Sequence, residues 1–179
     1  MYFAKPGREN TAKTVALVKQ VAAERGIGYI VVASNEGVTA DQLLGCGAKV
    51  VCITHPNGFR EPGQNEMSPA KRQELEQNGI SVYTGTLLFG GVERGIGKRF
   101  QGAYPAGILS STLKMFGQGT KVCVEIAVMA LDAGLIPHGE DIIAVGGTGR
   151  GADTALIVRP AHAGNVLDTW VSEVICKPR

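Results

Sequence analysis

The sequence lacks a strong charge imbalance, and it also lacks a long apolar run. Eighteen Lys and Arg residues stand against sixteen Asp and Glu residues, so the net charge is only +2. So small a charge does not indicate binding to nucleic acid or to an anionic membrane surface. No apolar stretch is long enough to span a bilayer, and the first residues do not have the pattern of a signal peptide. We therefore expect neither nucleic acid nor a membrane as a partner.

Cysteine and histidine are scarce, and neither is spaced for a metal site. The four cysteines form no C-x-x-C pair, and all but Cys46 lie in apolar runs, where a thiol behaves as a small core residue. The three histidines, His55, His138 and His162, show no metal-ligand spacing. No Ser-His-Asp or Cys-His arrangement stands out. The sequence therefore predicts a cytoplasmic protein without a metal site.

Glycine, in contrast, is abundant. It makes up 25 of the 179 residues, about 14% against a usual share of roughly 7%. The glycines gather at the ends of apolar runs and have no collagen-like period, which predicts loops that bring the backbone close to a ligand. The length and the hydrophobic content of 44% fit one globular domain over residues 1–179.

Five short runs rich in β-branched residues predict buried strands. They cover residues 29–33, 49–54, 80–84, 141–145 and 154–158, and residues 170–176 are expected to add a last edge strand. Helical patterns are expected at residues 11–25, 38–44, 69–78, 105–116 and 121–133, with Asn10 and Thr120 as two of the N-caps.

The spacing of these elements predicts the topology of the sheet. Helices alternate with the first three strands, which favours parallel right-handed crossovers. The eight residues between the fourth and fifth strands are too few for a crossover, so the fifth strand should be antiparallel. We expect a three-layer αβα domain with a mostly parallel five-stranded sheet in the order 3-2-1-4-5.

A crevice should open where the carboxyl ends of strands one and four part. Three loops would face it: residues 34–37, residues 146–153 and, from strand two, residues 54–59. The first of these follows the fully apolar run Tyr-Ile-Val-Val-Ala and precedes a helix. A strand, a turn of small residues and a helix N-terminus together form the usual ligand-facing corner of an α/β sheet.

Two glycine-rich segments resemble nucleotide-binding motifs only superficially. Residues 147–152 fit the pattern G-x-G-x-x-(G/A), but that motif requires a following helix, and residues 154–158 favour a strand. We expect a hairpin loop, either one that touches a ligand or one that does not. Residues 91–99 fail the P-loop spacing, because Val92 stands where the first glycine belongs and Arg99 where the hydroxyl belongs.

Residues 85–104 form the longest stretch without clear periodicity. They hold six glycines together with Arg94, Lys98 and Arg99. An ordered loop of this length is usually functional. Two readings are open: a flexible loop whose cations close over an anion, or a merely solvated loop.

His55 and Glu125 are the two candidates for proton transfer. His55 directly follows the second strand at the crevice, where it is either a polar ligand contact or a simple turn residue. Glu125 stands alone in a helix that is apolar nearly all round. It is a general base, a ligand contact or a structural glutamate with a partner.

The two crevice loops resemble those of a known fold. Residues 34–40 (Ser-Asn-Glu-Gly-Val-Thr-Ala) resemble the strand-turn-helix of the pyruvate kinase C-terminal α/β domain, where a related stretch cradles an effector phosphate in some members. Residues 149–154 (Gly-Arg-Gly-Ala-Asp-Thr) resemble the later glycine-rich loop of that domain. The whole chain is similar to a small family of stand-alone proteins with this fold. The match lies in residues 7–11, 54–55, 58–59, 121–126, 133–137, 146–148, 151–155 and 160–162.

The resemblance implies a five-stranded αβα domain and flavin mononucleotide (FMN) as a ligand, and it implies no particular reaction. The chain has no room for the catalytic barrel of pyruvate kinase, so we expect no pyruvate kinase activity. Glu36 departs from the pattern, because it replaces a small hydroxyl residue. A carboxylate repels a phosphate unless a cation such as Arg94 or Arg150 offsets it.

Three hypotheses follow from the sequence. The first is binding of a phosphorylated small molecule, FMN above all, with its phosphate on the backbone of residues 34–37 and the Arg94 loop as a lid. The second is a flavin-dependent enzyme that uses His55 or Glu125. The third is a regulatory or assembly module whose helix at residues 121–133 packs against a partner. A homo-oligomer is expected. The predicted binding residues are Ser34, Asn35, Gly37, Thr54, His55, Gly58, Phe59, Arg94, Gly95, Gly147, Thr148, Gly151, Ala152, Asp153 and Thr154.

Overall fold

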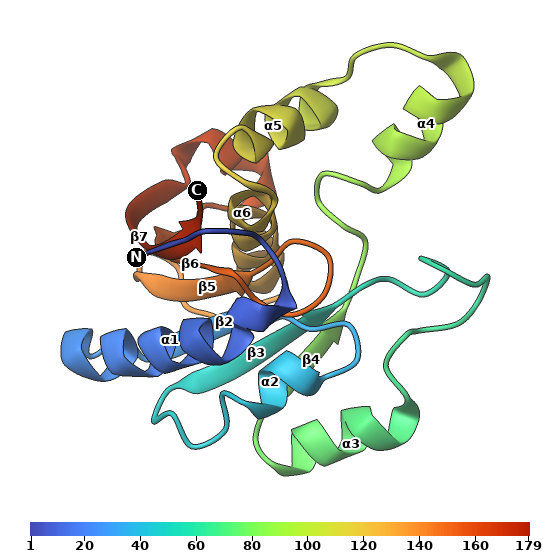
Figure 1. Cartoon of the computed structure of the whole chain (residues 1–179). Helices are drawn as coiled ribbons and strands as arrows, with labels where there is room; N and C mark the ends of the chain where they lie inside the picture. Colours follow the sequence, from blue (N-terminus) through green and yellow to red (C-terminus); the bar gives the residue numbers. More distant parts are fainter.

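Seven strands form one mixed sheet in the order β1-β7-β6-β5-β2-β3-β4 (Figure 1). The computed structural model describes all 179 residues. The strands are β1 (Tyr2–Phe3), β2 (Tyr29–Ala33), β3 (Lys49–Thr54), β4 (Ser81–Thr84), β5 (Ile142–Gly146), β6 (Thr154–Arg159) and β7 (Trp170–Pro178). The inner strand β2 runs parallel to β3 on one side and to β5 on the other.

Five neighbouring strands, β4, β3, β2, β5 and β6, confirm the order expected from the sequence, including the antiparallel pairing of β5 with β6. The expected count of five strands was wrong, because β7 and β1 extend the sheet beyond β6. Residues 170–176 were also expected at the edge, and they lie inside the sheet instead. The two-residue strand β1 pairs with β7 in parallel and covers that edge, and the amino group of Met1 donates to the carbonyl of Ile175 at 2.6 Å.

Helices cover both faces of the sheet and make three layers (Figure 1). They are α1 (Thr11–Arg25), α2 (Val38–Asp41), α3 (Pro69–Gln77), α4 (Val92–Phe100), α5 (Pro105–Lys114) and α6 (Gln118–Asp132), with 3-10 helices at Arg8–Asn10 and Ala163–Asp168. None of these helices is both long and apolar enough to cross a membrane.

Alternating side chains of each strand divide the core in two, as the period of two in a strand requires. On β2, Ile30 and Val32 face the core shared with α1, α2 and α3, whereas Val31 faces the core shared with α6. Helix α6 is therefore apolar nearly all round because it is buried against the sheet of its own chain, with α5 packed over it.

Residues 85–104 were expected to form an irregular loop, and this was wrong in part. Nine of them form helix α4, which stands away from the sheet on two irregular connections and contacts α5 (Figure 1). Its stripe Val92, Ile96 and Phe100 has the helical spacing of four, and the stripe is exposed. We call α4 and its two connections the arm.

Two helix starts also differ from expectation. Asn10 occupies the N-cap position of α1, but its side chain donates to the carbonyls of Lys5 and Gly7 and does not cap the helix. Helix α6 begins at Gln118, so Thr120 lies within its first turn and donates to the carbonyl of Phe116 at 3.1 Å. The Asn10 amide and the Thr120 hydroxyl thus donate to backbone carbonyls and accept from none of the free N–H groups at the helix starts.

Candidate functional site

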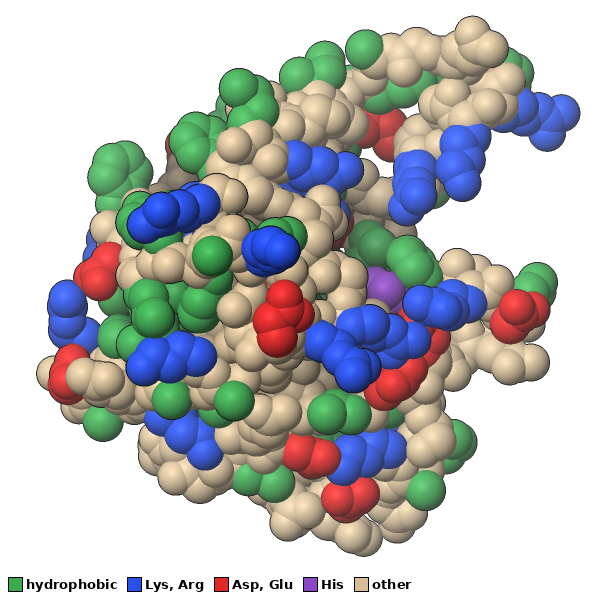
Figure 2. All heavy atoms as spheres, viewed as in Figure 1, with side chains coloured by type: hydrophobic (Ala, Val, Ile, Leu, Met, Phe, Trp, Pro, Cys, Tyr) green, Lys and Arg blue, Asp and Glu red, His purple; other side chains and the backbone are tan.

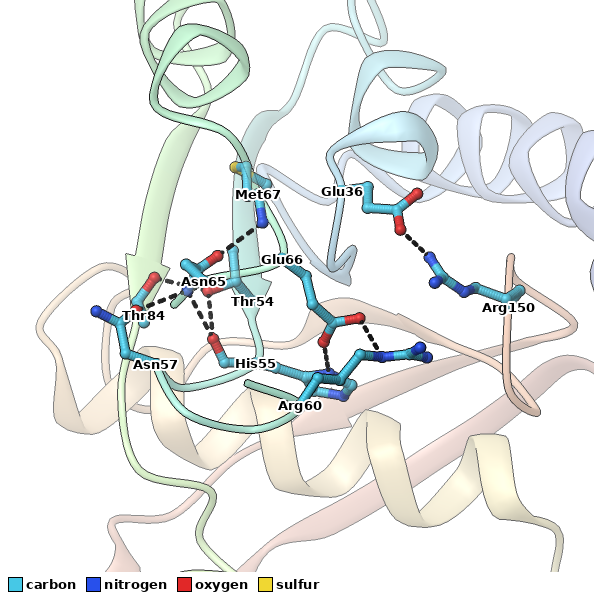
Figure 3. Close-up of polar contacts among 10 residues, drawn as sticks. All are labelled: Glu36, Thr54, His55, Asn57, Arg60, Asn65, Glu66, Met67, Thr84 and Arg150. Atoms are coloured by element: carbon cyan, nitrogen blue, oxygen red, sulfur yellow. Dashed lines mark hydrogen bonds and ion pairs between the residues drawn. The ribbon is translucent and has the colours of Figure 1, made fainter. Parts of the chain in front are cut away.

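The turns after β2 and β5 face one gap at the carboxyl edge of the sheet. Because β2 and β5 are parallel neighbours, both strands end at the same edge. An ion pair between Glu36 and Arg150 bridges the two turns (Figure 3). The Glu36 carboxylate raises the pKa of the Arg150 guanidinium, mainly through this hydrogen bond. Arg150 thus offsets the negative charge of Glu36 in the gap.

The gap opens into two adjoining hollows. The smaller, of about 790 Å³, lies between the turn at residues 34–37 and the loop at residues 147–151. The larger, of about 1110 Å³, lies under the arm and is lined by residues of α4, α5 and α6. Six residues line both hollows and form the wall between them: Ala33, Asn35, His55, Phe59, Gln118 and Val122.

Positive charge dominates the smaller hollow. Three arginines line it, Arg8, Arg60 and Arg150, against the single carboxylate of Glu36. Arg150 is paired with Glu36 and Arg60 with Glu66, whereas Arg8 forms no ion pair within the chain. Such a hollow attracts an anion, because the field of fixed cations adds up within a concave surface.

The turn at residues 34–37 presents unused backbone donors to this hollow. The Ser34 hydroxyl accepts from the N–H of Thr39 at 3.2 Å and so anchors the start of α2. The N–H groups of residues 35–38 donate to no acceptor within the chain. Gly37 adopts the left-handed region at φ 89°, which a side chain would strain. The turn therefore leaves consecutive donors free, the arrangement that binds anions in backbone nests.

The loop after β5 is held in shape by Asp153. Its fully buried carboxylate accepts from the N–H groups of Gly7 and Thr148 at 3.0 and 3.1 Å and from the Thr154 hydroxyl at 2.7 Å. The N–H of Ala152 donates to the Thr11 hydroxyl at 3.0 Å. These residues therefore shape the loop from behind, and the backbone around Gly147, Gly149 and Gly151 faces the hollow.

His55 belongs to an ordered cluster in the shared wall. Its Nδ1 donates to Glu66 Oε2 at 2.5 Å, and Arg60 Nε lies 2.9 Å from the other oxygen of Glu66 (Figure 3). The His55 ring stacks on Phe59 with centroids 3.7 Å apart and an angle of 24° between the planes. The carbonyl of His55 accepts from Asn65 and from the Thr54 hydroxyl. The imidazole is therefore fixed at Nδ1, which is how a carboxylate sets the tautomer of a histidine.

Glu125 is a partnered carboxylate on the floor of the larger hollow. It is 2% exposed, accepts from the N–H of Phe89 at 2.8 Å and pairs with Lys121 one turn earlier in α6. Both of its oxygens are therefore occupied by donors that tie the arm's base to α6. Of the roles left open for Glu125, these contacts favour the structural one.

The structure brings together most, but not all, of the residues singled out from the sequence. Eight of the fifteen predicted binding residues line at least one hollow, and Gly37 lies in the turn at residues 34–37 without lining either. Arg94 lines the larger hollow but not the smaller one. The lining residues are Ser34, Asn35, Thr54, His55, Phe59, Arg94, Gly147 and Gly151. The residues that line neither are Gly37, Gly58, Gly95, Thr148, Ala152, Asp153 and Thr154.

Several residues of the hollows were missed in the sequence, and for different reasons. Arg8 lies in the stretch of residues 7–11, which carried part of the family resemblance, so a signal for it was present. Arg60 and Glu66 lie in a polar segment without periodicity, and Gln118 opens a helix. Nothing in their local sequence marks them, because only the fold brings them to the gap.

Comparison with known proteins agrees with this architecture. The model of the family "Pyruvate kinase, alpha/beta domain" matches residues 12–158. Three crystal structures of pyruvate kinase from Cryptosporidium parvum, one of them in complex with ADP, align with 83–88% of this chain at 15–17% identity and TM-scores of 0.43–0.44. The chain spans only 22–24% of the length of those enzymes. From the match over residues 12–158, the chain belongs to the pyruvate kinase α/β domain family.

Proposed function

We propose that the smaller hollow binds a phosphorylated small molecule, FMN in the first place. The observation that carries this proposal is the gap itself: two turns of small residues face each other across a hollow lined by three arginines and one glutamate. Its volume of about 790 Å³ lies within the range of small-molecule sites.

The phosphate would lie against the turn at residues 34–37. Four consecutive N–H groups there have no acceptor in the chain. Arg8, which also lines the hollow, has no carboxylate partner and is available to a phosphate. Backbone donors and a guanidinium form charge-assisted hydrogen bonds to phosphate oxygens, which are stronger than those between neutral groups.

The flat part of the ligand would lie along the shared wall, with the loop at residues 146–154 around it. His55 and Phe59 form a stacked pair there, and Phe59 is 41% exposed. An exposed aromatic face is suited to the planar ring system of a flavin, since offset-stacked aromatic rings attract one another.

Purified protein tests the proposal directly. We expect flavin absorbance in the protein as isolated or, after ligand removal, quenching of FMN fluorescence on titration. Arg8→Gln should weaken FMN at least about tenfold, because a hydrogen bond to a charged group contributes about 1.5–3 kcal/mol. Riboflavin, which lacks the phosphate, should bind wild type more weakly than FMN does. Its affinity should not change in Arg8→Gln.

Lys13→Gln is the matched control, because it removes the same charge from an exposed residue of α1 outside both hollows. FMN affinity should be unchanged in this variant. If the two variants weaken FMN equally, or if wild type binds FMN no better than riboflavin, the phosphate site assigned here is wrong.

A second candidate, a flavin-dependent enzyme, is favoured by one observation. The Nδ1 of His55 is held by Glu66, and His55 lines both hollows. An imidazole fixed at one nitrogen is suited to move a proton at the other. Oxidation of a nicotinamide donor by the FMN-loaded protein, lost in His55→Gln with FMN affinity retained, would identify this function.

The proposal includes a homo-oligomer in the cytoplasm. All four cysteines are free, as expected in a reducing compartment. Leu167 and Trp170 expose most of their side chains near β7, and exposed apolar residues of this size favour self-association. Sedimentation velocity of wild type and of Trp170→Ser tests the oligomer. We do not propose a partner-binding role for the helix at residues 121–133, because α6 is buried within its own chain.

A further inference from the structure

Helix α4 of the arm turns its charged face, and not its apolar face, toward the body of the protein. A surface helix normally turns its apolar stripe inward. In α4 the apolar stripe Val92, Ile96 and Phe100 lies on the outside and lines neither hollow, whereas Arg94 and Lys98 line the larger one. Figure 2 shows Lys and Arg side chains gathered on the arm where it overhangs the hollow. Helix α4 therefore directs charge toward an open space.

These cations have no partners in the chain. Arg94, Lys98 and, from α5, Lys114 line the larger hollow and form no ion pair. The fourth cation, Lys121, is paired with Glu125, and Glu93 accepts from the N–H of Gly107. Three unpaired cations around one hollow repel each other, and an anion between them would remove that repulsion.

Apolar side chains also line the hollow. Leu87 and Phe89 come from the connection before α4, Ile108 and Met115 from the α5 region, and Ile126 from α6. Met115 exposes 82% of its surface. The hollow thus combines unpaired cations with apolar side chains, which suits a ligand that has an anionic group and an apolar body.

Ser110 adds a hydroxyl to the lining of the hollow. This residue of α5 is 7% exposed, and no hydrogen bond ties its hydroxyl to the rest of the chain. The one buried side-chain oxygen without a hydrogen-bond partner belongs to Glu66, so the Ser110 hydroxyl is accessible. A hydroxyl can donate to a carboxylate or phosphate oxygen, and Ser110 is therefore suited to bind the anionic group of a ligand.

The geometry points to a second binding site: the larger hollow takes an organic anion, a carboxylate or phosphate with an apolar body, whose charge is held by Arg94 and Lys98. This site goes beyond the FMN site and stands without it, because the two groups of cations lie in different hollows. The ligands would meet at the wall of His55 and Phe59.

The fluorescent sulfonate 8-anilinonaphthalene-1-sulfonate (ANS) is the probe, because it joins an anionic group to an apolar body. We expect it to bind wild type, and the double variant Arg94→Gln/Lys98→Gln should weaken it at least about tenfold. Arg99→Gln is the matched control, since Arg99 lies on the same helix but lines neither hollow. Binding of the neutral analogue N-phenyl-1-naphthylamine should not respond to these charges. Phenyl phosphate, benzoate or both should displace ANS, and the order of their affinities distinguishes a phosphate ligand from a carboxylate.

Four results would overturn the site. They are an equal loss of ANS affinity in Arg99→Gln, an unchanged affinity in the double variant, displacement by neither anion, and a loss in Val92→Ser/Phe100→Ser, which would place ANS on the outer stripe. Circular dichroism confirms that each variant is folded. FMN titration separates the two proposals, because the double variant should bind FMN like wild type whether or not it binds ANS.

Discussion

At the scale of single residues, Glu66 decides the shape of the wall between the hollows. Its side chain is 10% exposed and contacts both His55 and Arg60, which belong to a segment with no regular structure of its own. The Glu66 carboxylate holds this segment in place, because it binds the imidazole of His55 and pairs with the guanidinium of Arg60. A carboxylate in this position is worth more than an exposed ion pair, because little water screens it.

Glu66→Ala should lower the free energy of unfolding by about 1–3 kcal/mol, because the His55 imidazole loses its charged hydrogen-bond acceptor and Arg60 loses its ion-pair partner. It should also weaken FMN, since His55 and Phe59 lose their fixed position. Urea unfolding and FMN titration measure the two effects. Glu61→Ala, a change at an exposed neighbour in the same segment, should alter neither.

The cysteines give a second prediction at this scale. Burial raises the pKa of the Cys52 thiol to about 12, and burial also raises the pKa of Cys123 and Cys176. Their thiolate forms are therefore negligible at pH 8 and would appear only as the pH rises toward those raised values. Cys46 differs from these three cysteines because it is only half-buried.

We expect a disulfide reagent such as DTNB to modify Cys46 alone in the folded protein at pH 8 and all four thiols in urea. The absorbance of the released thiolate counts the groups. Cys46→Ser should abolish the fast reaction, and a second fast thiol in that variant would contradict the burial described here.

Several roles of single residues could not be predicted from the sequence. Asp153 was expected to contact a ligand, but it shapes the glycine-rich loop through Gly7 and Thr148. Its partners lie 146 and 5 residues away, so no local pattern reveals them. The same holds for Glu125 and the N–H of Phe89. Roles that depend on contacts between distant segments become visible only when the fold is known.

At the scale of helices and strands, local patterns were sufficient for five neighbouring strands, β4, β3, β2, β5 and β6, and insufficient for β1, for the place of β7 and for the arm. The runs of β2, β3 and β5 are buried on both faces and were clear in the sequence, and the short connection between β5 and β6 required them to be antiparallel. Helix α4 was hidden by Gly95 and Gly97, which lower helix propensity. Its signal was the stripe Val92, Ile96 and Phe100, and that stripe has no core to face.

Helix α6 approaches β6 closely at Gly119, which gives a prediction for a single methyl group. A Cβ at Gly119 would lie 2.0 Å from the Thr154 hydroxyl oxygen and 2.5 Å from its Cβ. Gly119→Ala should therefore lower the free energy of unfolding by about 1–3 kcal/mol, the usual effect of overpacking. Urea unfolding measures the change.

The same substitution in α5 is the control. A Cβ at Gly107 meets nothing within 4 Å, and its backbone is helical. Gly107→Ala should be neutral or stabilise the protein by up to about 1 kcal/mol, because alanine is the better helix former. Destabilisation of similar size in both variants would contradict the close contact between α6 and β6.

At the scale of the whole molecule, a ligand of the smaller hollow should stabilise the fold. The hollow joins the 3-10 helix at Arg8–Asn10, the turn after β2, the segment after β3, the loop after β5 and the start of α6, so the ligand would link five separate segments. At a concentration one hundred times its Kd, FMN should add about 2.7 kcal/mol. For a chain of this length the corresponding rise in Tm is roughly 5–11 °C.

Differential scanning fluorimetry measures this shift, and Arg8→Gln should reduce it at the same FMN concentration. Inorganic phosphate at equal concentration is the control, and it should give a smaller shift because it lacks the ring. An equal shift with phosphate alone would mean that the ring contributes nothing.

The wall of His55 and Phe59, common to both hollows, has a thermodynamic consequence. Any displacement of this wall by an occupant on one side alters the affinity on the other side, and linkage makes the effect reciprocal. If FMN changes the dissociation constant of ANS by some factor, ANS must change that of FMN by the same factor. Two titrations run in opposite order therefore measure one coupling energy, and a coupling that disappears in His55→Ala/Phe59→Ala would locate its origin in this stacked pair.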